Sequence, residues 1–150
     1  MATRIETLIA QVVTNLGADA AIDATKVFNN RIADLNDTEL PAYNVVLGPD
    51  QPRNELGPSN VAFIDWDQAL FIDLYARTIL QDADSTFLQM RANVHRALMA
   101  DVTQTLSFIM TTIPAGAEEP NIDDAGERKS LVYRTNWVFW IRTSIDDLET

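Results

Sequence analysis

The stretch of sequence that decides the fold is LVYRTNWVFWIRTSI, residues 131–145. Its odd-numbered positions are almost all apolar, whereas its even-numbered positions combine two arginines with valines and a tryptophan. Because side chains alternate across a β-strand, this pattern predicts a long strand with one face suited to a core. The other face is only half suited to water, which indicates contact with a protein partner.

Residues 61–80 show the same two-sided pattern and predict a second long strand. One face carries apolar side chains and the other mixes aromatic and charged ones. The two sets are Leu70, Ile72, Leu74 and Ala76, against Ala69, Phe71, Asp73, Tyr75 and Arg77. We expect the two long strands to pair, with Arg134 or Arg142 opposite Asp73 across the sheet.

Two helices are expected on either side of this strand in the sequence. Thr3 and Glu6 form a capping box before an apolar stripe over residues 5–16, and Gly17 is expected to end that helix. The second helix is expected to start at a cap, Asp82 or Asp84, and to run to about residue 101. Its predicted buried stripe comprises Phe87, Met90, Val94, Ala97 and Leu98.

The remaining segments predict short strands and loops. Strands are expected at residues 26–28, 42–47 and 106–113, with Gly48 and Pro49 ending the second and Pro114 ending the third. Residues 29–39 are expected to form a polar loop with one helical turn. Residues 49–60 and 115–128 are expected to form longer loops, the first either a plain surface excursion or an arm that docks on a neighbour.

The composition predicts one globular domain, residues 1–150. The apolar fraction of 47% is ordinary for such a domain, and the absence of cysteine excludes disulfides. Two helices with apolar stripes and a sheet with one apolar face favour an α+β fold, a two-layer sandwich. In it, a mixed, mostly antiparallel sheet carries the two main helices on one face.

Charge and hydropathy exclude several classes of partner. The net charge of -11 opposes ordinary nucleic-acid binding, which depends on Lys and Arg to neutralise phosphates. No apolar run is long enough to span a membrane, and the N-terminal residues do not resemble a signal peptide. We therefore expect a soluble protein without a membrane partner.

The sequence contains few residues in arrangements typical of catalytic sites. The one histidine, His95, lies in the second predicted helix without a metal-binding or triad context, and is best interpreted as solvated or at the edge of the core. Phosphate-binding and calcium-binding loops are absent. We expect no cofactor, no metal and no enzymatic activity; the alternative is a metal-dependent nuclease using Asp50, Glu127 and Lys129.

The order of elements resembles a known family. The segments are RIETLIAQVVTNL (4–16), KVFNNR (26–31), LPAYNVVLG (40–48), DLYAR (73–77), RANVHRALMAD (91–101) and VYRTNWVFWIRTSIDDLE (132–149). They resemble the tail terminator, or tail completion, proteins of long-tailed bacteriophages, the lambda minor tail protein U group. The resemblance covers nearly the whole chain.

This resemblance implies an α+β fold and a structural function. Such proteins form a ring, commonly a hexamer, that caps the tail tube, ends its polymerisation and joins the tail to the head. The implied partners are further copies of the chain, the tail tube protein and the head–tail connector or stopper protein. Genomic DNA would pass through the lumen without specific binding. The implied location is the head-proximal end of the virion tail, after assembly in the host cytoplasm.

The residues expected to form the subunit interface are our own inference from the strand patterns. They lie on the face of the sheet that the helices leave open: Phe71, Tyr75, Arg134, Val138, Trp140 and Arg142. Arg53 and Glu55, in the long loop, are a second choice. Two other functions remain open, a neck or head-completion connector protein and a monomeric regulatory binding module.

Overall fold

The structure is a computed structural model that describes residues 3–31, 37–53, 63–78, 83–122 and 129–144. The elements follow one another along the chain as α1 (Arg4–Ala18), η1 (Ala24–Lys26), β1 (Val27–Asn29), η2 (Asp37–Glu39), β2 (Ala42–Pro52), β3 (Phe63–Thr78), α2 (Ala83–Met99), β4 (Ile109–Ala117), β5 (Asn121–Ile122) and β6 (Lys129–Ser144).

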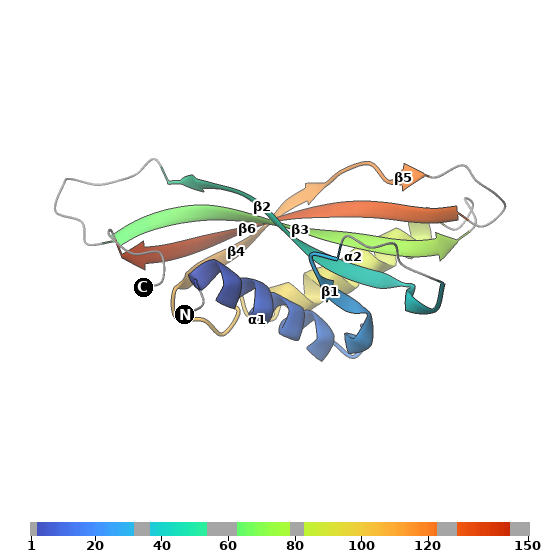
Figure 1. Ribbon diagram of the computed structural model, residues 1–150, viewed down its shortest axis with the longest axis horizontal. Helices are drawn as coiled ribbons and strands as arrows, with labels where there is room; N and C mark the ends of the chain where they lie inside the picture. Colours follow the sequence, from blue (N-terminus) through green and yellow to red (C-terminus); the bar gives the residue numbers. More distant parts are fainter. Residues whose placement is uncertain (1–2, 32–36, 54–62, 79–82, 123–128, 145–150) are drawn as a thin grey trace.

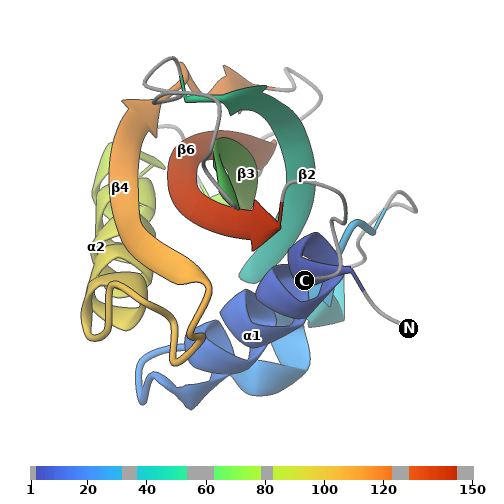
Figure 2. The same ribbon diagram turned by 90° about the vertical axis from the view of Figure 1, so that its left-hand side faces the viewer.

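The strands form one twisted sheet with both helices on the same side. The order across the sheet is β1-β2-β3-β6-β4, and β5 also pairs with β6. Among the strands that the structure describes, only the β1–β2 pair is parallel; the other pairs are antiparallel. The strands arch over α1 and α2 when the molecule is viewed along its length (Figure 2). The predicted α+β fold, with two helices on one face of a mostly antiparallel sheet, is confirmed.

The β3–β6 pair is the longest element of the sheet. The two strands pair without a register shift from Phe63 opposite Ser144 to Thr78 opposite Lys129. Sixteen residues of antiparallel strand span about 50 Å, and this two-stranded ribbon extends past the helical layer at both ends (Figure 1). The ribbon is therefore the frame on which the other strands and both helices are placed.

The start of α1 follows the predicted capping box. The backbone N–H of Glu6 donates to Thr3 Oγ1 (3.1 Å), and the Thr3 N–H donates to Glu6 Oε2 (2.7 Å). The helix ends at Ala18, one residue after Gly17. A Cβ at Gly17 would lie 3.0 Å from the Ala24 Cβ, so this glycine permits close packing of η1 rather than ending the helix.

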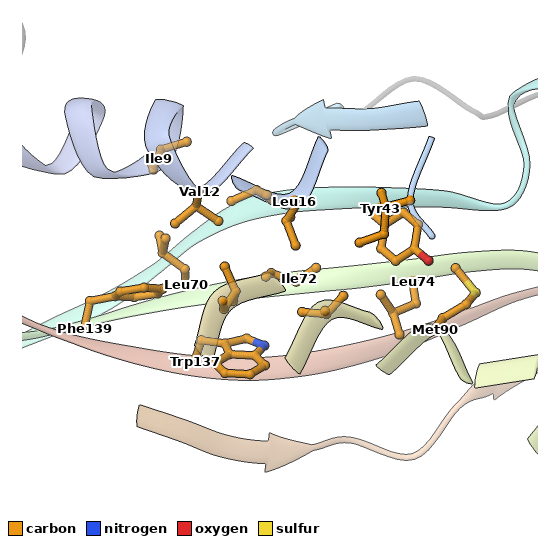
Figure 3. Close-up of a cluster of buried hydrophobic side chains, with 14 of the residues drawn as sticks. Ile9, Val12, Leu16, Tyr43, Leu70, Ile72, Leu74, Met90, Trp137 and Phe139 are labelled. Carbon is orange, nitrogen blue, oxygen red and sulfur yellow. The ribbon is translucent and has the colours of Figure 1, made fainter. Parts of the chain in front are cut away.

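The core lies between the helices and the apolar faces of β3 and β6. Alternate residues of both strands are buried, as the sequence predicted, and α1 and α2 supply the facing side chains (Figure 3). The buried residues include Leu8, Val12 and Leu16 of α1, Leu70, Ile72 and Leu74 of β3, Phe87, Met90, Val94 and Leu98 of α2, and Trp137, Phe139 and Ile141 of β6.

The predicted end of the second strand at Gly48 and Pro49 is wrong. β2 continues past both residues, and its register against β3 shifts between Leu47 and Asp50. A bulge of this kind accommodates proline, which cannot donate to the ladder. A Cβ at Gly48 would lie 2.9 Å from the Ala69 carbonyl oxygen, so glycine allows β2 to approach β3 closely here.

The prediction for residues 106–128 is wrong in two places. β4 begins later than expected and continues through Pro114, which lies opposite Trp137 at the edge of the sheet, where a missing donor is tolerated. The expected loop over residues 115–128 contains the end of β4 and the short strand β5. The second helix matches its prediction closely, but the candidate cap Asp82 lies outside the described residues.

We predict that Phe139→Ala lowers the free energy of unfolding by about 3–5 kcal/mol, because Phe139 is fully buried and its removal leaves a cavity. Phe63→Ala is the matched control: Phe63 is 49% exposed at the end of β3, so its loss should cost well under half as much. Chemical denaturation of both variants checks this. Equal losses would contradict the placement of the core.

Candidate functional site: the open face of the sheet

The sheet face opposite the helices is the candidate site. Alternation places the odd-numbered residues of β3 and the even-numbered residues of β6 on this side, which we call the open face. All six interface candidates from the two long strands lie on it: Phe71, Tyr75, Arg134, Val138, Trp140 and Arg142. Where the structure describes their side chains, each is partly exposed.

One ion pair lies near the middle of β3. Arg134 is the register partner of Asp73, and its guanidinium donates twice to that carboxylate, Nε to Oδ1 at 2.8 Å and Nη2 to Oδ2 at 3.0 Å. The Asp73 side chain is only 6% exposed. Arg134 also lies over the Phe71 ring, 4.5 Å from its centroid. The hydrogen bonds to Asp73 raise the pKa of Arg134, and the predicted Asp73–Arg134 pairing is confirmed.

A second cluster of charges lies toward the other end of the ribbon. Arg142 donates to both carboxylate oxygens of Asp65, at 2.8 and 3.1 Å, so the alternative pairing of Arg142 with Asp73 is wrong. Arg53 stacks on the Trp140 ring, 4.0 Å from its centroid, and lies 3.4 Å from an oxygen of Asp67. These interactions bring the loop candidate Arg53 onto the same face as the strand candidates.

An apolar strip crosses the open face between the two charge clusters. Val46 of β2 is opposite Phe71 of β3, and Ala69 of β3 is opposite Val138 of β6. On the far side, Val138 is opposite Ile113 of β4, which is 40% exposed. The strip therefore runs across four strands, with a bidentate Asp–Arg pair on each side of it. Apolar centres with polar borders are typical of protein–protein interfaces.

The remaining sequence candidates fall in different places. Tyr75 lies near the end of the open face, where burial raises the pKa of its hydroxyl. Glu55 and Glu127 lie outside the described residues. The structure therefore does not test whether Glu55 takes part in an interface, or whether Asp50, Glu127 and Lys129 lie together as a nuclease would require. His95 is exposed on α2, with its ring 5.9 Å from that of Trp137.

Among the residues that the structure describes, no group of three or more His, Asp or Glu side chains could hold a metal ion. In the same part of the chain, no helix is long and apolar enough to cross a membrane.

The predicted interface residues left out several residues of the open face. Asp65 and Asp67 anchor the second charge cluster, and Ile113 ends the apolar strip. The alternation of β3 places both aspartates on this face from sequence alone. Ile113 could not be placed, because its position depends on the register between β4 and β6.

The comparisons with known proteins bear on the fold. No family model matches the sequence, and no curated protein does. One solved structure with a similar fold is a chain in the virion of a native gene transfer agent (GTA) particle, with a TM-score of 0.51 and 15% sequence identity. The match covers 89% of this chain and 94% of that one.

We predict that Arg134→Met lowers the free energy of unfolding by about 1–3 kcal/mol, because it leaves the buried Asp73 carboxylate unpaired. The partial exposure of Arg134 keeps the loss at the lower end of the range for buried pairs. The double variant Asp73→Asn/Arg134→Met should recover part of the loss. Urea denaturation at neutral pH tests this, and a double variant less stable than the single one would contradict it.

The Asp65–Arg142 pair predicts a dependence of stability on pH. The Arg142 guanidinium holds the pKa of Asp65 below its ordinary value of 3.8, so this carboxylate stabilises the fold when ionised. Its contribution is fully present above pH 3.8 and is lost as the pH falls through the lowered pKa. Asp65→Asn should therefore destabilise the protein at neutral pH, and the difference should shrink on acidification. A constant difference down to about pH 2 would contradict this.

Proposed function

We propose that this chain is a structural subunit of a phage-like particle that closes into a ring at the head-proximal end of the tail. The ring caps the tail tube, ends its polymerisation and joins it to the head. The observation that carries the proposal is the similarity of fold to a chain in a GTA virion, over 89% of this chain. The resemblance of element order to tail terminators adds the specific position in the particle.

The chemistry of the open face supports contact with further copies of the chain. Burial of its apolar strip against another chain would favour association. The arginines on either side of the strip are paired within the chain, Arg134 with Asp73 and Arg142 with Asp65. A neighbour that covers these two pairs therefore buries guanidinium groups that already have partners, whereas burial of an unpaired guanidinium would be costly. If the contact joins the open face to a different surface of the next copy, repeated contacts close a ring when the rotation between neighbouring copies divides a full turn.

The edges of the sheet favour contact through the face over strand addition. At one edge, β1 has only three residues, and the part of β2 beyond it contains Pro49 and Pro52. At the other edge, β4 contains Pro114. Proline on an edge strand blocks backbone pairing with another chain. The assembly surfaces in this proposal are therefore faces of the sheet and helix surfaces.

The charge of the chain is consistent with DNA passing through such a ring. The sequence has 22 acidic and 11 basic residues, and several arginines are already paired with acids within the fold. An acidic surface repels phosphates, so DNA would pass without being retained.

The ring proposal predicts that Val138→Asp prevents self-association, because it places a charge at the centre of the apolar strip. Ala10→Asp, at an exposed position of α1, is the matched control. Analytical ultracentrifugation measures the oligomeric state, and electron microscopy of the protein mixed with tail tubes shows whether tube ends are capped. The parent and the control should form rings, alone or on tube ends, and Val138→Asp should not.

A parent protein that neither forms rings nor binds tube ends would overturn the proposal. Particles lacking the protein distinguish a tail terminator from a head-completion connector. Loss of a terminator should yield overlong or headless tails, whereas loss of a head-completion protein should yield heads that leak DNA.

A further inference from the structure

The outer side of α2 carries a surface depression that the open face does not include. It has a volume of about 400 Å³ and is lined by Leu88, Arg91, Ala92, His95 and Arg96. These positions are spaced three or four apart along the helix, so they share one stripe. Leu88 is 59% exposed, more than any other large apolar side chain in the described part of the chain.

The charge of this depression is opposite to that of the protein as a whole. Its lining has two arginines and no carboxylate, in a chain with a net charge of -11. Arg96 is held by Asp19, 2.9 Å away, and Arg91 donates to the Tyr133 hydroxyl at 3.1 Å. Within the described residues Arg91 has no carboxylate partner, so its charge is available to a ligand. The depression therefore suits an acidic segment that carries an apolar side chain.

We propose that this depression binds residues 145–150 of a second copy of the chain. That segment reads IDDLET, with Leu148 between Asp147 and Glu149. Leu148 would pack against Leu88, and the acidic side chains beside it would face Arg91. This inference rests on the proposed function to the extent that both require copies of the chain to meet, and it supplies a contact separate from the open face.

The distance along β6 favours a neighbouring copy over the molecule's own residues 145–150 as the source of the segment. Arg91, which lines the depression, donates to the Tyr133 hydroxyl, so this part of the depression lies near Tyr133. β6 ends at Ser144, at the opposite end of the ribbon from the start of α2 (Figure 1). The eleven residues from Tyr133 to Ser144 cover about 37 Å of strand. Six further residues span at most about 21 Å even when fully extended. In this proposal, the contact of Leu148 with Leu88 therefore joins two copies.

A labelled peptide tests the proposal on the full-length protein. The peptide TSIDDLET (143–150) is titrated against dilute, monomeric protein at low salt, and binding is followed by fluorescence anisotropy. We expect saturable binding that weakens at least about tenfold with Leu88→Glu or Arg91→Glu. Ala10→Glu, on α1, adds the same charge at an exposed site elsewhere and should leave binding unchanged.

A charge exchange makes the test specific. A peptide with both aspartates replaced by lysine should lose binding to the parent and regain it with Arg91→Glu. No binding by the parent, or equal binding by the parent and the Leu88 and Arg91 variants, would overturn the proposal. Because the titration uses monomers, it is independent of ring formation: rings without peptide binding would reject this contact alone, and peptide binding without rings would reject the proposed function alone.

Discussion

The uninterrupted pairing of β3 with β6 is the constraint on which the rest of the structure depends. Sixteen residue pairs in one register fix which side chains of both strands face the helices and which face away. A slip of one residue would move every apolar side chain of a strand to the other face. The same register brings Asp73 opposite Arg134 and Asp65 opposite Arg142, so the core and the open face are set by one set of hydrogen bonds.

The helices complete this arrangement without adding to the open face. α1 and α2 cover one side of the ribbon and bury its alternating apolar residues, while the other side keeps a mixture of paired charges and apolar groups. The fold of the GTA virion chain shares this architecture over nearly its whole length. The proposed ring would need contacts beyond the open face, and the depression on α2 is the second contact surface that we propose, at a different place in the molecule.

Alternation and helical periodicity predicted the parts of the fold that depend on local patterns. The two long strands and both helices follow from residue spacing alone, whereas spacing left Arg134 and Arg142 as alternative partners of Asp73 until the register decided between them. The strand ends predicted from proline and glycine were wrong, because tertiary context decides there. β2 continues past Gly48 and Pro49 through a bulge, and β4 contains Pro114 because β4 lies at an edge of the sheet. For the open face, sequence identified the aromatic and arginine residues of the long strands. It could not show that Arg53 stacks on Trp140, since that contact depends on the path of a loop.

The extension of the β3–β6 ribbon beyond the helices has a mechanical consequence. In the middle, the ribbon is backed by two helices and flanked by further strands, so it resists bending (Figure 1). Other described segments flank the ribbon except at residues 63–64 with 143–144 and 77–78 with 129–130, and a strand pair alone twists more easily than a packed sheet. The outermost residue pairs of the ribbon can therefore twist against less resistance than its centre.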